Sequence, residues 1–447
     1  MQVELYNEMK KDPETAASHA ARVCYTTDDS LLDKKIDVKA RLVETGHHST
    51  LEHSYFTFYL KDIPVSLAVF GLHLSSPFYN TDQRSGRFSK MYDAPDFRAI
   101  EASLRGLYPD KDLTKVMAWI QKGCQIYRDN LPHLTELAKQ AIQKERPFAN
   151  EKYIQQNAPK FAQEQLRMFI SQCAPTAMDY TIDVSALMAL YRTAHSPEMR
   201  LLTQKMVDEV LKQHPELAYM FDKEKQNKRD WAPTFTPHKA HVVERPTVLL
   251  THTFLNEKEI VPPTSMDSLD TLPFDPDTMN NTQQLIQTEV IISCATYGQD
   301  QRHRSVKRGQ PLFTGQFYLP PLLKQAHLEP QAKEFMQQWL DLRAEEGDSL
   351  ATTVAPYGAM VVTQKTYDMN ALFHEQGKRT CWCAQEEIYH TSAQLRKFLE
   401  NQIHRPEVLA CLAPPCLKSG KCQEGVRYCG RAIKNVPAQH YFPARTV

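Results

Sequence analysis

One short pattern occurs twice in this chain and limits the folds that the chain can adopt. The pattern T-x-D-x-[SN]-A-L stands at Thr181–Leu187 and again at Thr366–Leu372, and an Ala-Pro pair precedes each copy, at 174–175 and 355–356. The chain of 447 residues is too long for one ordinary core and has room for two copies of a unit of about 200 residues. We therefore predict two related units in tandem, against the alternative that so short a match arises by chance.

The spacing of apolar residues predicts both long helices and strands. Apolar residues recur every three or four positions over 113–144 and 198–214, which is typical of helices with one buried face. The aromatic run Tyr55–Leu60 lacks this spacing and predicts a strand, while Asp-Pro-Glu at 12–14 predicts the start of a helix. An α+β fold with a mixed sheet and long helices is the expected class.

The domain limits follow from composition. The segment 223–237 is charged and interrupted by prolines, as connections between domains often are. Six of the ten cysteines lie in the last part of the chain, from Cys381 onward. We expect a first unit at 1–225, a linker at 226–237, a second unit at 238–402 and a cysteine-rich tail at 403–447.

The charge balance excludes several kinds of partner. Lysine plus arginine and aspartate plus glutamate number 53 each, so there is no overall positive field to hold nucleic acid or an anionic membrane surface. The longest apolar stretch, 63–74, is too short to span a bilayer, and the N-terminus lacks a signal-peptide pattern. We expect a cytoplasmic protein with no nucleic-acid or membrane partner.

A histidine-rich box at 46–53 reads Gly-His-His-Ser-Thr-Leu-Glu-His. So many imidazoles in one short segment suggest a metal site, but His47, His48 and His53 lack the spacing of a helical ligand pair. A hydrogen-bonded turn with partly buried histidines is the alternative that requires no ligand. The box alone does not decide between these interpretations.

Two further motifs carry arginines. Ser-Gly-Arg-Phe occupies 85–88, and Arg-His-Arg occupies 302–304, three residues after Gln299. Guanidinium and hydroxyl groups are suitable donors to phosphate, so both motifs are candidate sites for a phosphorylated ligand. A dense basic triplet on its own is more often a solvated surface.

Taken in order, these motifs resemble the signature of the flavin-dependent thymidylate synthases, the ThyX or thymidylate synthase-complementing family. That signature runs GHxSPxEH, FTF and Q-x-x-RHRxxSxNExSxRY. Here the box at 46–53 precedes Phe-Thr-Phe at 56–58 and the S-x-R-F motif at 85–88, while the complete Q-x-x-RHR stands at 299–304. The segment 20–25 is also similar to the first helix of the family.

The resemblance implies FAD-dependent reductive methylation of dUMP to dTMP, with methylenetetrahydrofolate as carbon donor, NADPH as electron donor and no protein nucleophile. It also implies two sets of ligand-binding residues. For FAD these are His47, Ser49, His53, Arg302, His303, Arg304 and Asp368, and for dUMP they are Gln83, Arg84, Ser85, Gly86, Arg87, Gln299 and Asn370. Because the family's sites lie between subunits, two such chains would form a homodimer that imitates the family's homotetramer.

Each half departs from the family signature where the other half keeps it. The first half has no arginine at the RHR positions, near 72–77, and Asp82-Gln83 stands where the family has Asn-Glu. The second half has the RHR triplet but lacks the histidine box. These complementary losses predict a flavin site assembled between the two halves.

Other departures leave two alternatives open. The family's N-L-R and A-Q-x-E-I-R segments correspond to 368–370 and 384–389, which have lost the arginines. The chain could therefore be a diverged flavoenzyme that acts on another nucleotide or on a base within nucleic acid. It could also be a binding protein derived from the family that catalyses nothing.

Four cysteines near the end of the chain lie outside the family signature. Cys411, Cys416, Cys422 and Cys429 could close a tetrahedral zinc site, since prolines and glycines between them permit tight turns. They lack the CxxC knuckles of common zinc ribbons, so free or redox-active thiols are the alternative. Our hypothesis is that a structural zinc ion holds the cysteine-rich tail in place.

Overall fold

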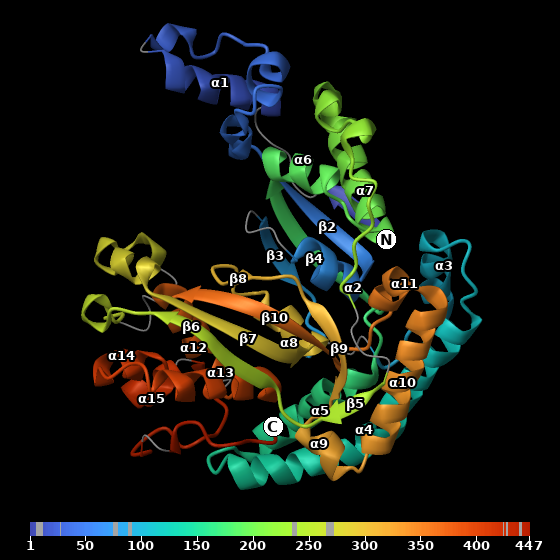
Figure 1. Cartoon of the computed structure of the whole chain (residues 1–447), viewed down its shortest axis with the longest axis vertical. Coiled ribbons are helices and arrows are strands. Elements are labelled where there is room, and N and C mark those ends of the chain that lie inside the picture. Colours follow the sequence, from blue (N-terminus) through green and yellow to red (C-terminus); the bar gives the residue numbers. More distant parts are fainter. Residues whose placement is uncertain are drawn as a thin grey trace. The chain divides into compact units, whose positions relative to one another are not determined.

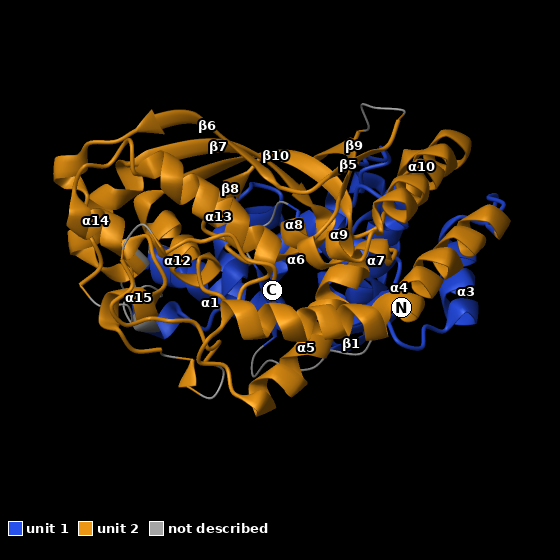
Figure 2. Cartoon of the chain, turned by 90° about the horizontal axis from the view of Figure 1, so that it is seen from below, with its two compact units in different colours: residues 1–113, 172–232, 352–354 blue, residues 114–171, 233–351, 355–447 orange. Residues whose placement is uncertain are grey.

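The computed structural model (Figure 1) describes residues 1–5, 12–26, 28–74, 79–87, 92–234, 239–264, 272–422, 424–425, 428–437 and 440–447. The chain forms two compact units (Figure 2). Unit 1 comprises 1–113, 172–232 and 352–354, and unit 2 comprises 114–171, 233–351 and 355–447. The limits of the two sequence copies remain a prediction.

Unit 1 is built on an antiparallel sheet with the strand order β1-β2-β4-β3. The strands are β1 (Gln2–Leu5), β2 (Tyr55–Pro64), β3 (Tyr79–Gln83) and β4 (Pro175–Asp183). The α-helices are α1 (Pro13–Tyr25), α2 (Val65–Leu67), α3 (Phe97–Leu107), α6 (Val184–Arg192) and α7 (Pro197–Gln213). Short 3-10 or π turns are η1 (Asp29–Leu31), η2 (Lys39–Val43), η3 (His48–His53), η4 (Ala68–Leu72), η6 (Pro215–Met220) and η7 (Lys223–Lys225).

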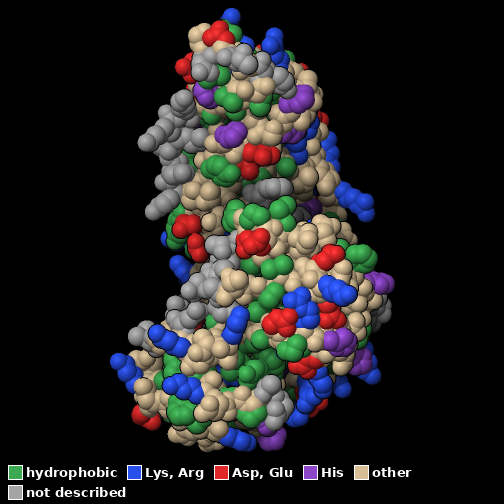
Figure 3. All heavy atoms as spheres, turned by 90° about the vertical axis from the view of Figure 1, so that its left-hand side faces the viewer, with side chains coloured by type: hydrophobic (Ala, Val, Ile, Leu, Met, Phe, Trp, Pro, Cys, Tyr) green, Lys and Arg blue, Asp and Glu red, His purple; other side chains and the backbone are tan. Residues whose placement is uncertain are grey.

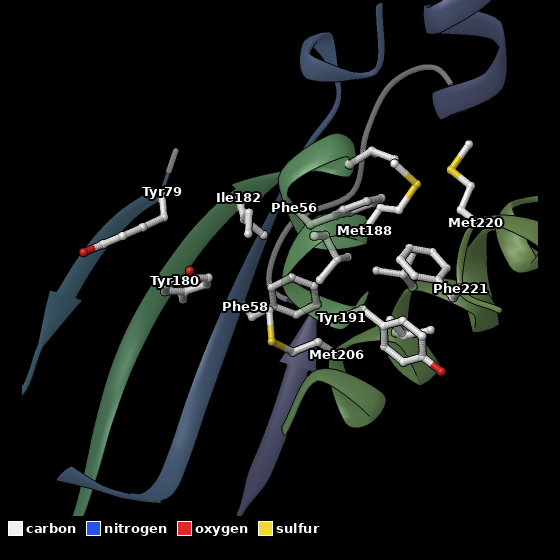
Figure 4. Close-up of a cluster of buried hydrophobic side chains, with 14 of the residues drawn as sticks. Phe56, Phe58, Tyr79, Tyr180, Ile182, Met188, Tyr191, Met206, Met220 and Phe221 are labelled. Atoms are coloured by element: carbon white, nitrogen blue, oxygen red, sulfur yellow. The ribbon is translucent and has the colours of Figure 1, made fainter. Parts of the chain in front are cut away.

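The core of unit 1 forms because alternate residues of β2 point to one face of the sheet. Phe56 and Phe58 are fully buried, and they stand opposite Ile182 and Tyr180 of β4. Figure 4 shows these rings beside Met188, Tyr191, Met206 and Phe221, which lie on α6, on α7 and after η6. The predicted strand at 55–60 and the helix opening at 12–14 are both confirmed, with Asp12 accepting a hydrogen bond from the Thr15 N–H at 2.8 Å.

Unit 2 contains a larger sheet with the order β5-β9-β10-β7-β6, in which β5 runs parallel to β9 and the other pairs are antiparallel. The strands are β5 (His241–Val243), β6 (Thr247–Phe254), β7 (Leu285–Ser293), β8 (Lys307–Arg308, beside β10), β9 (Leu312–Tyr318) and β10 (Ala359–Asp368). The mixed sheet and the helices around it confirm the α+β class.

The helices of unit 2 include the longest of the described chain. They are α4 (Thr114–Glu145), α5 (Glu151–Leu166), α8 (Cys294–Asp300), α9 (Pro321–Gln325), α10 (Glu329–Glu346), α12 (Met369–Arg379), α13 (Glu386–Leu399), α14 (Pro406–Cys411) and α15 (Pro415–Ser419). α11 (Asp348–Thr353) crosses a unit limit, and the 3-10 turns are η5 (Arg167–Phe169), η8 (Glu257–Glu259), η10 (Leu272–Phe274) and η11 (Pro276–Gln283). The predicted helices at 113–144 and 198–214 correspond to α4 and α7 within one residue at each end.

The two sheets have the same core topology when each is considered separately. The order β1-β2-β4-β3 in unit 1 corresponds to β6-β7-β10-β9 in unit 2. The aspartate of each T-x-D copy caps the helix that follows, because Asp183 accepts from Ala186 N–H and Asp368 from Ala371 N–H, both at 2.7 Å. The Ala-Pro pairs are not equivalent, since 174–175 leads directly into β4 whereas 355–356 ends three residues before β10.

A close approach in unit 2 makes Gly123 of α4 difficult to replace. A Cβ at this position would lie 2.2 Å from the carbonyl oxygen of Phe169 and 2.8 Å from the ring of Phe335. We expect Gly123→Ala to lower the free energy of unfolding by about 1–3 kcal/mol, because a backbone carbonyl cannot move aside as a flexible side chain can. Denaturant unfolding measures this loss.

The matched control for that substitution is Gly106→Ala in α3, where a Cβ would meet nothing within 4 Å. Alanine there should raise the free energy of unfolding by about 0.5–1 kcal/mol, because glycine disfavours a helix. Equal effects of the two substitutions would show that the close approach of α4 has no energetic weight.

The surface carries charges of both signs. On the face in Figure 3, Lys and Arg side chains are interspersed with Asp and Glu, as the equal totals of basic and acidic residues suggest. Among the described residues, no helix combines the length and the apolar character needed to cross a lipid bilayer.

Candidate functional site

The histidine box of unit 1 forms a turn followed by a short 3-10 helix. Gly46 has a φ of +81°, and η3 then covers 48–53. Thr50 and Leu51 are buried and anchor the segment, while the side chains of His47, Ser49 and His53 are exposed. The ring of His48 bonds the Val43 carbonyl at 3.1 Å. The turn therefore presents to solvent the three side chains assigned to FAD by resemblance.

The Ser-Gly-Arg-Phe segment follows β3 in the same unit. Arg84 donates its N–H to the Ala177 carbonyl at 2.9 Å, and Ser85 Oγ accepts from the Arg87 N–H at 3.3 Å. Ser85 is exposed, and Arg87 is half-buried. Phe88 lies outside the described residues, as do 75–77 of the segment that corresponds to the family's RHR in this half.

The box and the Ser85 segment lie at opposite ends of β4. The box leads into Tyr55, which pairs with Asp183, whereas Gln83 pairs with Met178 and Arg84 bonds Ala177. Six residues of strand separate Ala177 from Asp183, or about 20 Å at 3.3 Å per residue. Within unit 1, the structure therefore does not bring together the residues assigned to FAD and those assigned to dUMP.

The Arg-His-Arg loop of unit 2 follows α8, and its three side chains differ in exposure. His303 is buried, Arg302 is half-buried and Arg304 is exposed. Gln299, on α8, donates from its amide to the Ala295 carbonyl at 3.2 Å and to the side-chain oxygen of Gln385. The loop thus keeps one side chain of the triplet inside and presents at least Arg304 to solvent.

A buried ion network holds this loop. Asp300 pairs with Arg308 at 2.5 Å and with Lys365, and Lys365 also pairs with Glu375 at 3.0 Å. Arg308 donates to the carbonyls of His303 at 3.1 Å and Val306 at 2.8 Å. Although burial alone would raise the pKa of Asp300, the charges of Arg308 and Lys365 hold that pKa well below its usual range. The Asp300 carboxylate that pairs with Arg308 therefore remains ionised at neutral pH.

Glu387 of α13 anchors the start of α8. Its carboxyl group is fully buried and accepts from the Ser293 N–H at 2.7 Å, from the Thr296 hydroxyl at 2.6 Å and from the Ser293 hydroxyl. Burial raises the pKa of Glu387 to about 7, although these donors oppose the shift. Ser293 is also the N-cap of α8, so one carboxyl group connects α13 with α8, the helix that precedes the loop.

Asp368 and Asn370 make hydrogen bonds within unit 2 that stabilise its fold. Asp368 is the N-cap of α12. Asn370 is buried, accepts from the Asn281 amide at 2.8 Å and donates to the Thr278 carbonyl at 3.2 Å. Their roles toward FAD and dUMP remain predictions from the resemblance.

Arg379 belongs to none of the sequence motifs but lies against the Arg-His-Arg loop. Its Nε donates to Nε2 of His303 at 2.7 Å, and its Nη2 donates to the Gln299 carbonyl at 2.8 Å. Arg379 is the last residue of α12, where a cation commonly complements the helix dipole. Because that ordinary role explains an arginine there, no sequence signal marked it as a neighbour of the loop.

No described cysteine is part of a disulfide bond. Within the described ranges, no group of three or more His, Cys, Asp or Glu side chains is arranged to hold a metal ion. Cys411 instead lies 3.3 Å from the Lys418 ammonium group. No such group is found in the described part of the chain for the zinc site predicted from Cys411, Cys416, Cys422 and Cys429.

Comparisons with known proteins agree with the motifs. Residues 4–216 match the sequence model of the family described as "Thymidylate synthase complementing protein". A solved structure of flavin-dependent thymidylate synthase ThyX from Helicobacter pylori, complexed with FAD and dUMP, is 17% identical with a TM-score of 0.30. A second, of Thymidylate Synthase X (ThyX) from the same organism with FAD and dUMP, is 19% identical with a TM-score of 0.28. Each covers 51% of this chain and 100% of its own, and no curated protein matches.

Proposed function

We propose that the chain is a flavin-dependent thymidylate synthase, on the premise that residues 4–216 match the model of the thymidylate synthase complementing protein family. The reaction is the reductive methylation of dUMP to dTMP, with methylenetetrahydrofolate as carbon donor and NADPH as electron donor. The observation that carries the proposal is the set of motifs itself. The matched segment contains the histidine box and the S-x-R motif, and the Arg-His-Arg triplet stands on a rigidly held loop.

The residues of the Arg-His-Arg loop suit a flavin. Nδ1 of His303 is buried and has no hydrogen-bond partner among the described residues, so this atom could bond a polar ring atom of a flavin. Arg302 and Arg304 carry guanidinium groups, which bind phosphate through paired hydrogen bonds. FAD, when bound and reduced, would supply the hydride of the reaction.

The other side chains of the proposed site bind and orient ligands. Ser85 and Arg87 can donate hydrogen bonds to the phosphate of dUMP, and Gln299 can bond its base. The box side chains His47, Ser49 and His53 would complete the flavin contacts. No residue is required as a covalent nucleophile, so the protein's contribution is orientation and stabilisation of charge.

We further propose that the flavin contacts come from both residue sets, because each set supplies what the other half of the sequence lacks. The shared order of β1-β2-β4-β3 and β6-β7-β10-β9 supports an internal repeat of one ancestral unit. A chain that contains two such units would need one further copy of itself to imitate a four-unit assembly. The proposed assembly is therefore a homodimer, which light scattering of the purified protein can test.

The first test of the flavin site is Arg302→Ala. Loss of one guanidinium group should weaken flavin binding by about tenfold to a hundredfold, the effect of removing a hydrogen bond to a charged group. The absorption spectrum of the purified protein, titrated with FAD, measures this change. Arg245→Ala is the matched control, because Arg245 is an exposed arginine of the same unit outside the motifs. If Arg302→Ala keeps its full yellow colour and its activity, the assignment fails.

A second candidate function is a flavoenzyme for a different nucleotide. The position where the family has an arginine is Asn370, whose amide bonds Asn281 and Thr278 within unit 2. This chain therefore lacks one cation that the family places near the substrate. Oxidation of NADPH in the presence of dUMP and methylenetetrahydrofolate, compared with other nucleotides, separates the two functions.

A further inference from the structure

The contact between Arg379 and His303 fixes the position of a proton. Arg379 Nε lies 2.7 Å from Nε2 of the His303 ring. A guanidinium group can only donate, so Nε2 must accept and cannot carry a hydrogen. A neutral imidazole has one ring proton, and this proton must therefore be on Nδ1. The geometry alone assigns the tautomer.

The surroundings of His303 keep the ring neutral. It faces Arg379 and His374 of α12, Asp300 of α8 and Lys365 of β10. Burial is the largest influence on the ring, and with the charge of Arg379 it lowers the pKa of His303 well below the ordinary value, while Asp300 opposes them. A second proton would also have to occupy Nε2, where it would meet the Arg379 N–H.

The Nδ1–H group is an unused donor. Nδ1 is buried, and no described residue accepts a hydrogen bond from it. Arg379 is itself held by its second bond, from Nη2 to the Gln299 carbonyl at 2.8 Å. The ring is therefore held from one side, and its remaining donor is available for an acceptor that the chain does not provide.

We propose that Arg379 is a positioning residue, which holds His303 as a neutral Nδ1–H donor toward an acceptor atom of the bound flavin. The inference rests on the proposed function, since it places flavin at the Arg-His-Arg loop. The tautomer, however, is a property of the ligand-free chain and can be measured without any flavin. The same role is open to no other described cation, because only Arg379 donates to the His303 ring in the described hydrogen bonds.

The first experiment is NMR of the full-length protein with ¹⁵N-labelled histidine, with His303→Gln used to assign the signal. We expect His303 to be in the Nδ1–H form and its pKa to lie well below the ordinary histidine value of about 6.5. In Arg379→Met, the ring should lose this single tautomer, and its pKa should rise toward the ordinary value. Lys378→Met, which removes an exposed cation one residue away, should change neither property.

The second experiment measures flavin binding by the same variants. Arg379→Met should bind FAD about tenfold to a hundredfold more weakly than the unaltered chain, and Arg379→Lys, which keeps a donor and a charge, should recover part of the affinity. Thermal unfolding followed by circular dichroism identifies any variant that has not folded. If Arg379→Met does not fold, Arg379→Lys is compared with the unaltered chain instead.

The possible results distinguish a failure of the positioning role of Arg379 from a failure of the proposed function. A His303 ring protonated on Nε2 in the unaltered chain would overturn the inference, whatever the flavin result. Unchanged affinity for FAD in Arg379→Met, together with an altered tautomer, would also overturn it but leave the proposed function intact. If the unaltered chain has the expected tautomer but binds no FAD, the proposed function fails, and the flavin part of the inference fails with it.

Discussion

Replacing Lys365 by methionine should destabilise the protein by about 3–5 kcal/mol, the range for removing one partner from a buried ion pair. Lys365 is 2% exposed and bonds both Asp300 and Glu375, which are each 3% exposed. Methionine fills a similar volume but removes the positive charge that pairs with the two buried carboxylates. The free energy of unfolding from denaturant titration gives the size of the loss.

The matched control is Lys307→Met. Lys307 lies on β8 opposite Thr366 and is exposed, so its removal should change the free energy of unfolding by no more than about 0.5 kcal/mol. Adding Glu375→Gln to Lys365→Met should restore part of the lost stability, because one of the uncompensated charges is removed. A loss below about 1 kcal/mol for Lys365→Met would mean that water reaches the network and screens it.

A dependence of stability on pH is expected from Glu387. Its pKa is about 7 in the folded chain, against about 4.3 for an unperturbed glutamate, so the folded state binds this proton more tightly than the unfolded state does. The contribution is therefore fully present below about pH 4.3 and is lost as the pH rises through about 7. The expected loss is about 4 kcal/mol, from 1.36 kcal/mol per pKa unit.

Glu387→Gln isolates this contribution from the other titrating groups. The amide cannot ionise, and the hydroxyls of Ser293 and Thr296 can turn to accept from it. The difference in free energy of unfolding between the parent and Glu387→Gln should move in favour of the parent as the pH falls from about 7.5 to 4.5. A difference that is constant over this range, or that moves the other way, would contradict the raised pKa.

Features of the fold that depend on local sequence could be predicted. The limits of α4 and α7 agree with their apolar spacing within one residue, and the aromatic run at 55–60 is part of β2. Each of these depends on residues a few positions apart, which determine the face of a helix or strand that is buried. The α+β class followed from the same local patterns.

The supports of the Arg-His-Arg loop could not be predicted in this way. Lys365 and Asp300 are 65 residues apart in the chain, and Arg379 and His303 are 76 apart. Such pairs depend on the folded sheet and helices, and each residue alone has an ordinary explanation as a strand residue or a helix end. The spacing of four cysteines along the chain likewise does not show whether their thiols converge on one point in the folded structure.

The distance between the histidine box and the Ser85 segment in unit 1 limits which ligands can contact both segments. The two segments adjoin opposite ends of β4, about 20 Å apart. A mononucleotide is too short to reach both, so within one unit these segments must serve either different molecules or one elongated molecule. The length of β4 therefore decides whether one small ligand can contact both segments of a unit. With a shorter β4, a single mononucleotide could reach both.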